Sequence, residues 1–120
     1  AVFLQDYPAG LAALARLRPP DYRVAERLEL YIGGIELANG FSELTDGREQ
    51  RRRFMAQRAA RRALRASTLP LDEAFLRMLS DGRMPMAGGM ALGLDRLIAV
   101  LSGMDDIHQT RAFSMDRDSI

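Results

Sequence analysis

The sequence predicts a chain of mixed strands and helices that is built around one antiparallel hairpin. From Glu26 to Ile32, apolar and polar residues alternate with period two, which is typical of a strand. Gly33-Gly34 follows, and both central positions of the favoured two-residue hairpin turn require positive φ. Residues 35–45 supply the return strand. With 120 residues and 48% hydrophobic content, the chain fits one compact domain or a piece of a larger one.

The stretch before the hairpin predicts a strand and a connector. Residues 1–5 are strand-forming and begin without a lead-in, so we expect the chain to be a part cut from a longer protein. Asp6-Tyr7-Pro8 closes this strand, because the residue before a proline is pushed out of the helical region. Residues 11–17 are rich in Ala and Leu, and we interpret them as a connector that Pro19-Pro20 ends.

Two helices are predicted after the hairpin. Residues 48–66 form a long helix with eight arginines, which is either an RNA-binding face or a solvated surface. The arginines surround most of this helix, and that distribution favours the solvated surface. Residues 71–80 have apolar side chains at helical spacing, which indicates packing against a core, and Asp81-Gly82 is a stop signal.

A glycine-rich stretch near the C-terminus predicts a strand that turns into a helix. Residues 90–92 read as a buried strand, Gly93 as its turn and residues 94–101 as a buried helix. Such a turn lets backbone approach a flat or phosphorylated ligand. Arg96 would face that ligand, or would instead pair with Asp95 or with a core carboxylate. The tail from residue 104 is mixed, with a possible short strand at 112–115.

The hairpin geometry predicts which carboxylates share a face of the sheet. Opposed residues lie on one face, as do residues two apart on a strand, so Glu29 and Glu36 are diagonal neighbours on the same side. Two such carboxylates repel unless a divalent cation lies between them or one is protonated. Asn39 and Glu43 fall on the opposite face unless a bulge, which we expect near Asn39-Gly40, shifts the strand by one residue.

The composition excludes several classes of chemistry. All seventeen basic residues are Arg, so lysine nucleophiles, Schiff bases and the P-loop lysine are absent. Zero Cys excludes disulfides and thiol catalysis and is compatible with the reducing cytoplasm, where we expect the protein. His108 is the single His, and we interpret it as a surface residue. The apolar runs are too short for a membrane span, and a net charge of +1 does not by itself indicate nucleic acid or membrane.

Two of these stretches together resemble the C-terminal part of a class II lysyl-tRNA synthetase catalytic core. The resemblance is carried by residues 36–46 (E-L-A-N-G-F-S-E-L-T-D) after Gly33-Gly34, and by a "motif 3" pattern from Gly89 to Arg96. Lysyl-tRNA synthetases usually have Gly where this chain has Ala38 and Ala91. Alanine at both positions is closer to the elongation factor P–(R)-β-lysine ligase family, which is a lysyl-tRNA synthetase paralogue.

The resemblance implies an α+β fold, with an antiparallel sheet flanked by helices, and a site for ATP, Mg²⁺ and an amino acid. Glu29 and Glu36 match the acids that hold Mg²⁺ on the ATP phosphates. Asn39 and Glu43 match positions that bind the amino acid, with Glu43 at its side-chain ammonium. Ala91 would add a methyl to the floor of the amino-acid pocket and favour β-lysine over lysine.

The same resemblance assigns the nucleotide to the motif 3 stretch at 86–101. Arg96 matches the catalytic arginine that packs on adenine and reaches the γ-phosphate, and Gly89 and Gly93 match glycines beside the nucleotide. Attack of a carboxylate on the α-phosphate brings two anions together, so catalysis depends on charge neutralisation and alignment rather than on a protein nucleophile.

The implied function is ATP-dependent activation of lysine or β-lysine as an adenylate and its transfer to a lysine of elongation factor P. Two alternatives stay open: a lysyl-tRNA synthetase that charges tRNA, and a non-catalytic paralogue used for binding. We expect residues 1–120 to be a single partial domain that lacks motifs 1 and 2. We therefore expect these residues to be inactive alone, and the full-length protein to be a homodimer.

Overall fold

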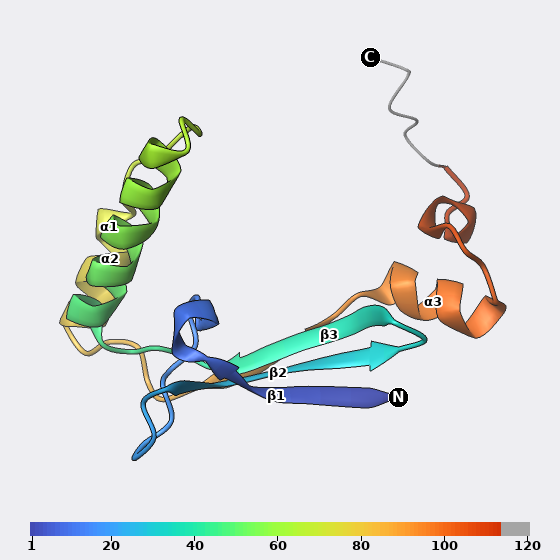
Figure 1. The fold of residues 1–120 in the computed structure, drawn as a ribbon, viewed down its shortest axis with the longest axis horizontal. Helices are drawn as coiled ribbons and strands as arrows, with labels where there is room; N and C mark the ends of the chain where they lie inside the picture. Colours follow the sequence, from blue (N-terminus) through green and yellow to red (C-terminus); the bar gives the residue numbers. More distant parts are fainter. Residues whose placement is uncertain (114–120) are drawn as a thin grey trace.

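The computed structural model describes residues 1–113 and shows an α+β fold around a four-stranded antiparallel sheet in the order β1-β2-β3-β4 (Figure 1). Its strands are β1 (Val2–Pro8), β2 (Val24–Ile32), β3 (Ile35–Ser42) and β4 (Gly88–Leu92). Its helices are α1 (Gly47–Ala63), α2 (Glu73–Ser80) and α3 (Leu94–Ser102), with 3₁₀ turns η1 (Ala9–Leu11) and η2 (Ile107–Thr110). The predicted antiparallel sheet with flanking helices is confirmed.

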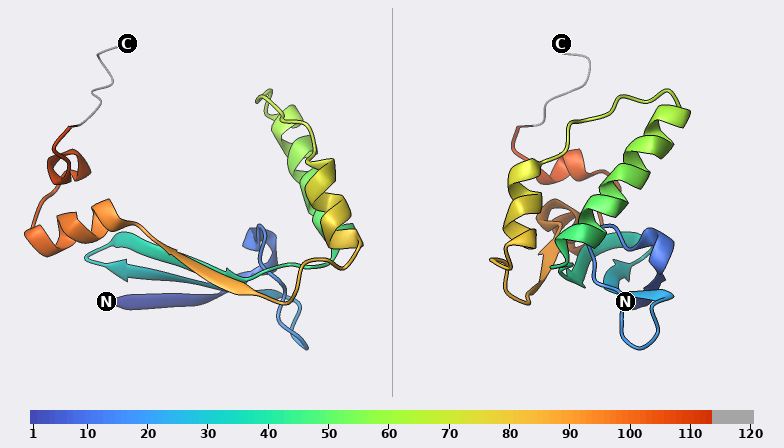
Figure 2. Two further views of the ribbon diagram at one scale, coloured as in Figure 1. Left: turned by 180° about the vertical axis from the view of Figure 1, so that it is seen from behind. Right: turned by 90° about the vertical axis from the view of Figure 1, so that its left-hand side faces the viewer.

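The helices lie at the two ends of the sheet. α1 and α2 stand side by side beyond one end, whereas α3 and η2 lie at the other end, beside the β2–β3 turn (Figures 1 and 2). The radius of gyration is 17.8 Å, compared with about 14 Å for a compact domain of this length. This extended arrangement leaves much of the sheet open.

The β2–β3 hairpin forms with the expected turn. Gly33 and Gly34 have φ of 59° and 81°, and Ile32 pairs with Ile35 as the two-residue loop requires. One register shift interrupts the ladder, because Tyr31 pairs with Glu36 but Leu30 pairs with Ala38. Leu37 is therefore the extra residue of a β-bulge.

The predicted position of the bulge, near Asn39-Gly40, is wrong. Gly40 lies in regular pairing, with Leu28 on one side and Met90 on the other. A Cβ on Gly40 would lie 2.8 Å from the Gly89 carbonyl oxygen and 2.9 Å from the Met90 Cβ. Glycine is therefore needed at this position because β4 approaches closely. It is not needed to give the backbone the freedom for a bulge.

The burial predicted for the glycine-rich stretch is also wrong. All five residues of β4 are exposed, since it is an edge strand, and Ala99 is the only buried residue of α3. The helix predicted at 48–66 ends three residues earlier, at Ala63, and begins with Asp46 accepting hydrogen bonds from the Arg48 and Glu49 amides. Part of the strand predicted at 112–115 lies outside the described residues.

Two small apolar clusters hold the elements together. Ala12, Ala15 and Ala25 form one cluster between the connector and β2, with Tyr7 and Phe41 packed against it. The α1–α2 pair has the other, in which Leu76 and Leu79 of α2 are buried and the Phe54 and Phe75 rings lie 6.4 Å apart. The predicted core-facing side of α2 is confirmed at Leu79, whereas Ala74 is exposed.

We predict that Gly40→Ala destabilises the protein by about 1–3 kcal/mol, because β4 must move away from the added methyl. Gly10→Ala is the matched control, since a Cβ there meets no atom within 4 Å and its φ is not positive. Urea unfolding of both variants measures the difference. Equal midpoints would show that β4 does not pack tightly on Gly40.

Candidate active site

The bulge at Leu37 brings the predicted polar residues onto one face of the sheet. It places Asn39 directly between Glu29 of β2 and Ala91 of β4, and it leaves Glu36 opposite Tyr31 on that same face. The next row toward the helical pair holds Arg27, Phe41 and Gly89 in β2, β3 and β4. We call this surface the polar face.

Glu29 is the most enclosed charge on the polar face, with 6% of its surface exposed. Its Oε1 accepts hydrogen bonds from Arg27 Nη2 at 2.6 Å and Asn39 Nδ2 at 3.3 Å, and its Oε2 accepts one from the Tyr31 hydroxyl at 2.7 Å. Hydrogen bonds from Tyr7 and Tyr31 lower the pKa of the Glu29 carboxyl. The carboxylate is therefore held ionised despite its burial.

Arg27 is the functional residue that sequence reasoning missed. It forms an ion pair with Glu29, its Nη1 donates to the Leu11 carbonyl at 2.8 Å, and its guanidinium lies 4.6 Å from the centre of the Tyr7 ring. Burial and the Glu29 carboxylate raise the pKa of Tyr7 to about 12, so Tyr7 remains a donor. The signal was present, because Arg27 and Glu29 are two residues apart on one strand and must share a face.

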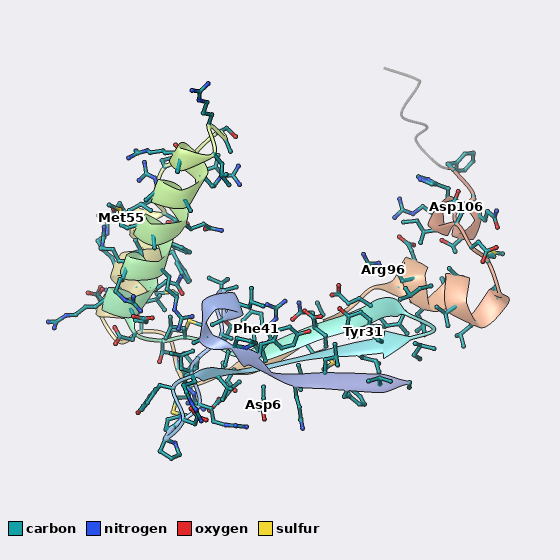
Figure 3. All side chains as sticks on the ribbon, viewed as in Figure 1. Asp6, Tyr31, Phe41, Met55, Arg96 and Asp106 are labelled. Atoms are coloured by element: carbon teal, nitrogen blue, oxygen red, sulfur yellow. The ribbon has the colours of Figure 1, made fainter. Side chains whose placement is uncertain are left out.

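Arg96 lies in α3, at the end of the polar face beside the β2–β3 turn (Figure 3), and it meets Glu36 there. Arg96 Nη1 donates to the Glu36 carbonyl oxygen at 2.9 Å and lies 3.7 Å from Glu36 Oε2. Asp95, the partner considered as an alternative, instead pairs with Arg111. About half of the Arg96 side chain is exposed, so its guanidinium is open to a ligand.

Gly89 and Gly93, the two glycines of the motif 3 stretch matched to the nucleotide, differ in their surroundings. A Cβ on Gly93 would lie 3.4 Å from Arg96 Cδ, so this glycine leaves room for the arginine stem to lie back toward the sheet. A Cβ on Gly89 would meet nothing within 4 Å, because the polar face is open there. Space for a ligand therefore exists beside Gly89, near the start of β4, whereas Arg96 lies beyond the other end of this strand.

Asn39 presents an unused acceptor to the polar face. Its Nδ2 donates to Glu29, whereas its Oδ1 is buried and has no hydrogen-bond partner within the described part of the chain. A buried acceptor without a donor is costly, and an ammonium or hydroxyl of a ligand would satisfy it. Ala91 lies directly beside it on β4, where a side chain can limit the space for such a ligand.

Glu43 lies just beyond β3, continuing the alternation that places Asn39 and Phe41 on the polar face. It is half-buried, its backbone amide donates to the Ala87 carbonyl at 2.9 Å, and it forms a bridge with Ala15. Among residues 1–113 its carboxylate has no ion-pair partner, which leaves it available for a cation from outside the chain.

Ala38 does not belong to this surface. It pairs with Leu30 and Leu92, and it is buried on the opposite side of the sheet. Of the two alanines that distinguish the chain from lysyl-tRNA synthetases, only Ala91 can touch a ligand on the polar face.

The chain's own side chains do not enclose a metal ion. No group of three Asp, Glu or His residues that could hold one exists among the described residues. Glu36 and Glu29 share a face, and Glu29 is occupied by donors from its neighbours. This donor set fits Mg²⁺ that takes most of its oxygen ligands from substrate phosphates and water, which is how Mg²⁺ is commonly bound.

The polar face is an open surface rather than a closed pocket. A hollow of about 430 Å³ beside it is lined by Gln5, Leu28, Gly40 and Met90, from the other side of the sheet, and by Gly89. A groove of about 890 Å³ runs between α1 and residues 9–17. Neither is lined by Glu29, Glu36, Asn39 or Arg96. Elements outside residues 1–113 would be needed to cover the candidate site.

Comparison with known families shows which family this chain belongs to. Residues 1–117 match the family described as tRNA synthetases class II (D, K and N). The chain belongs to this family. The bulge and the polar face described above are therefore features of a class II synthetase fold.

Curated class II relatives narrow the similarity further. The chain is 47% identical over 115 residues to "Elongation factor P--(R)-beta-lysine ligase" of Sodalis glossinidius, and 48% identical over 115 residues to the protein of that name from Erwinia tasmaniensis. The protein of the same name from Edwardsiella ictaluri is 47% identical over 116 residues. These alignments cover 96–97% of this chain but only 35% of each relative, so the chain spans about a third of their length.

No helix within residues 1–113 is both long and apolar enough to cross a bilayer.

We predict that Arg27→Met destabilises the full-length protein by about 3 kcal/mol, because it leaves the buried Glu29 carboxylate without its cation. Arg23→Met is the matched control, since the Arg23 side chain is 89% exposed, and it should change stability by less than about 0.5 kcal/mol. Adding Glu29→Gln to Arg27→Met should recover part of the loss. Chemical denaturation measures all three, and the absence of recovery would contradict the charge argument.

Proposed function

We propose that this chain is the C-terminal part of a catalytic domain that activates β-lysine with ATP and transfers it to a lysine of elongation factor P. The observation that carries the proposal is the polar face, where Asn39 offers an unpaired buried acceptor beside Ala91 and Arg96 lies next to Glu36. The identity of 47–48% to ligases of that name supports it.

In this proposal the nucleotide binds at the motif 3 end of the polar face. Arg96 holds the adenine and the terminal phosphate beyond the α3 end of β4, and Gly93 leaves room for the stem of this arginine. Glu29 and Glu36 hold Mg²⁺, which neutralises phosphate charge when it is bound. Arg27 and the two tyrosines keep Glu29 ionised and fixed in position.

The amino acid binds along β3, from Asn39 toward Glu43. Glu43 accepts its side-chain ammonium, and the free Oδ1 of Asn39 accepts a hydrogen bond from its β-amino group. Ala91 occupies the space in which an α-amino group would otherwise lie. The substrate carboxylate then attacks the α-phosphate, pyrophosphate leaves, and the resulting adenylate is attacked by the acceptor lysine, which releases AMP. No side chain of this protein becomes covalently attached.

The second candidate is a lysyl-tRNA synthetase that charges tRNA with lysine. Ala91 is the observation against it, because the added methyl lies on the polar face itself. Pyrophosphate exchange by the full-length protein with lysine and with (R)-β-lysine, followed by transfer to elongation factor P or to tRNA, separates the two. Exchange with neither amino acid would instead favour a non-catalytic paralogue.

We predict that Ala91→Gly lowers the preference for β-lysine over lysine by roughly tenfold, because one methyl in a pocket discriminates on that scale. Ala38→Gly is the matched control: it removes the same methyl from the buried opposite side and should cost about 1 kcal/mol of stability without changing selectivity. The ratio of kcat/KM values for the two amino acids is the measurement. An unchanged ratio in Ala91→Gly would contradict the role of this methyl.

We predict that residues 1–120 alone do not catalyse pyrophosphate exchange, because the polar face is uncovered and, among residues 1–113, no arginine for the α-phosphate lies on it beyond Arg27 and Arg96. The full-length protein assayed in parallel is the positive control. Exchange by the isolated chain at a rate near that of the full-length protein would show that these residues contain a complete site.

A further inference from the structure

The arginines of α1 divide into two groups with different electrostatic surroundings. Three of the four in its first half form ion pairs, because Arg51 pairs with Glu73, and Arg52 and Arg53 both pair with Glu49. Residues 54–71 contain four arginines and no Asp or Glu. We call this second group the arginine tip; it comprises Arg58, Arg61, Arg62 and Arg65.

The arginine tip is at the end of α1 that stands farthest from the sheet (Figure 1). Arg61, Arg62 and Arg65 are exposed, and Arg61 Nε donates to the Ser67 backbone carbonyl at 2.7 Å. Leu64 and Leu69 lie among them with 80% and 81% of their surfaces exposed. The tip therefore combines unneutralised charge with apolar area on a projecting element.

Stabilisation of the helix itself does not account for the whole cluster. Cations near a helix C-terminus interact favourably with its dipole, which explains Arg61 and Arg62 in the last turn of α1. That effect is confined to the last turn, so it does not explain Arg58. Arg65 lies just beyond the helix in the left-handed region, with φ of 53°. Surface charges that repel one another without a partner reduce stability.

We propose that the arginine tip is a docking surface for an acidic face of the protein that accepts the activated amino acid. The sign of the charge requires an anionic partner, and the exposed leucines suit a protein surface, because interfaces combine arginine with apolar contacts. RNA is the other anionic candidate, but sequence-tolerant binding of unpaired RNA relies on aromatic stacking, and residues 55–74 contain no aromatic side chain. The proposal rests on the proposed function, which supplies the acceptor.

The test compares two triple variants of the full-length protein with equal changes in charge. Arg61→Gln, Arg62→Gln and Arg65→Gln together remove the exposed part of the tip, whereas Arg23→Gln, Arg48→Gln and Arg83→Gln remove three exposed arginines elsewhere. None of the six lies on the polar face. Three measurements follow for each protein: pyrophosphate exchange with β-lysine, binding of elongation factor P by calorimetry, and transfer to elongation factor P at several salt concentrations.

The tip variant should keep the exchange rate of the unmodified protein, since exchange needs no acceptor. Its affinity for elongation factor P and its kcat/KM for transfer should fall by roughly tenfold, mainly through KM, and the deficit should shrink as salt rises. The control variant should lose less than about twofold. Equal losses in the two variants, or none in the tip variant, would overturn the proposal.

Two further outcomes separate this proposal from its premise. If the unmodified protein shows no exchange but still binds elongation factor P through the tip, the proposed function is wrong and the docking surface stands. If the tip variant loses binding to tRNA while binding of elongation factor P is unchanged, the tip is an RNA surface and the docking proposal is wrong.

Discussion

The one-residue shift at Leu37 determines which side chains of this molecule can act together. Side chains on a strand alternate between faces, so a single extra residue moves everything beyond it to the other side. Without the shift, Glu36 and Asn39 would lie on opposite faces of β3, because their separation is odd. With it, Asn39 pairs with Glu29 while Glu36 still faces Tyr31. Ala91 and Gly89 of β4 lie on the same face, because they pair with Asn39 and Phe41 of β3.

A buried carboxylate on such a surface needs a permanent cation, and the chain provides one. Arg27 pairs with Glu29 and also ties β2 to the connector through the Leu11 carbonyl. The ring of Tyr7 lies under the same guanidinium, and its hydroxyl contributes to the low pKa of Glu29. Removing an ion from water is costly, and this network offsets the cost of burying the Glu29 carboxylate before any ligand binds. Glu29 therefore has a cation supplied by the chain itself, whereas Glu43 has no ion-pair partner among residues 1–113.

The sequence determined the hairpin and most elements because their signals are local. Two glycines that both require positive φ specify the turn between residues 32 and 35, and capping by Asp46 marks the start of α1. The bulge was expected because the polar residues otherwise fall on two faces, but its position was misassigned to Gly40. Glycine satisfies two unrelated needs, backbone freedom and close approach, and only the contact of Gly40 with β4 distinguishes them. Burial of β4 and α3 was mispredicted for a related reason, since apolar composition does not reveal whether a covering element is present.

The arginines show how one residue type can serve three physical purposes in a chain without lysine. Arg27 is a buried counter-ion, and its planar guanidinium allows simultaneous contact with a carboxylate, a carbonyl and a ring. Arg96 is half-exposed and anchored by a single carbonyl, which leaves most of its donors for a ligand. Those of the tip form no ion pair with an acid among residues 1–113. The sequence alone does not distinguish these arginines. The structure does, because an arginine with an acidic neighbour in space stabilises the fold, whereas an arginine without one is available to a partner.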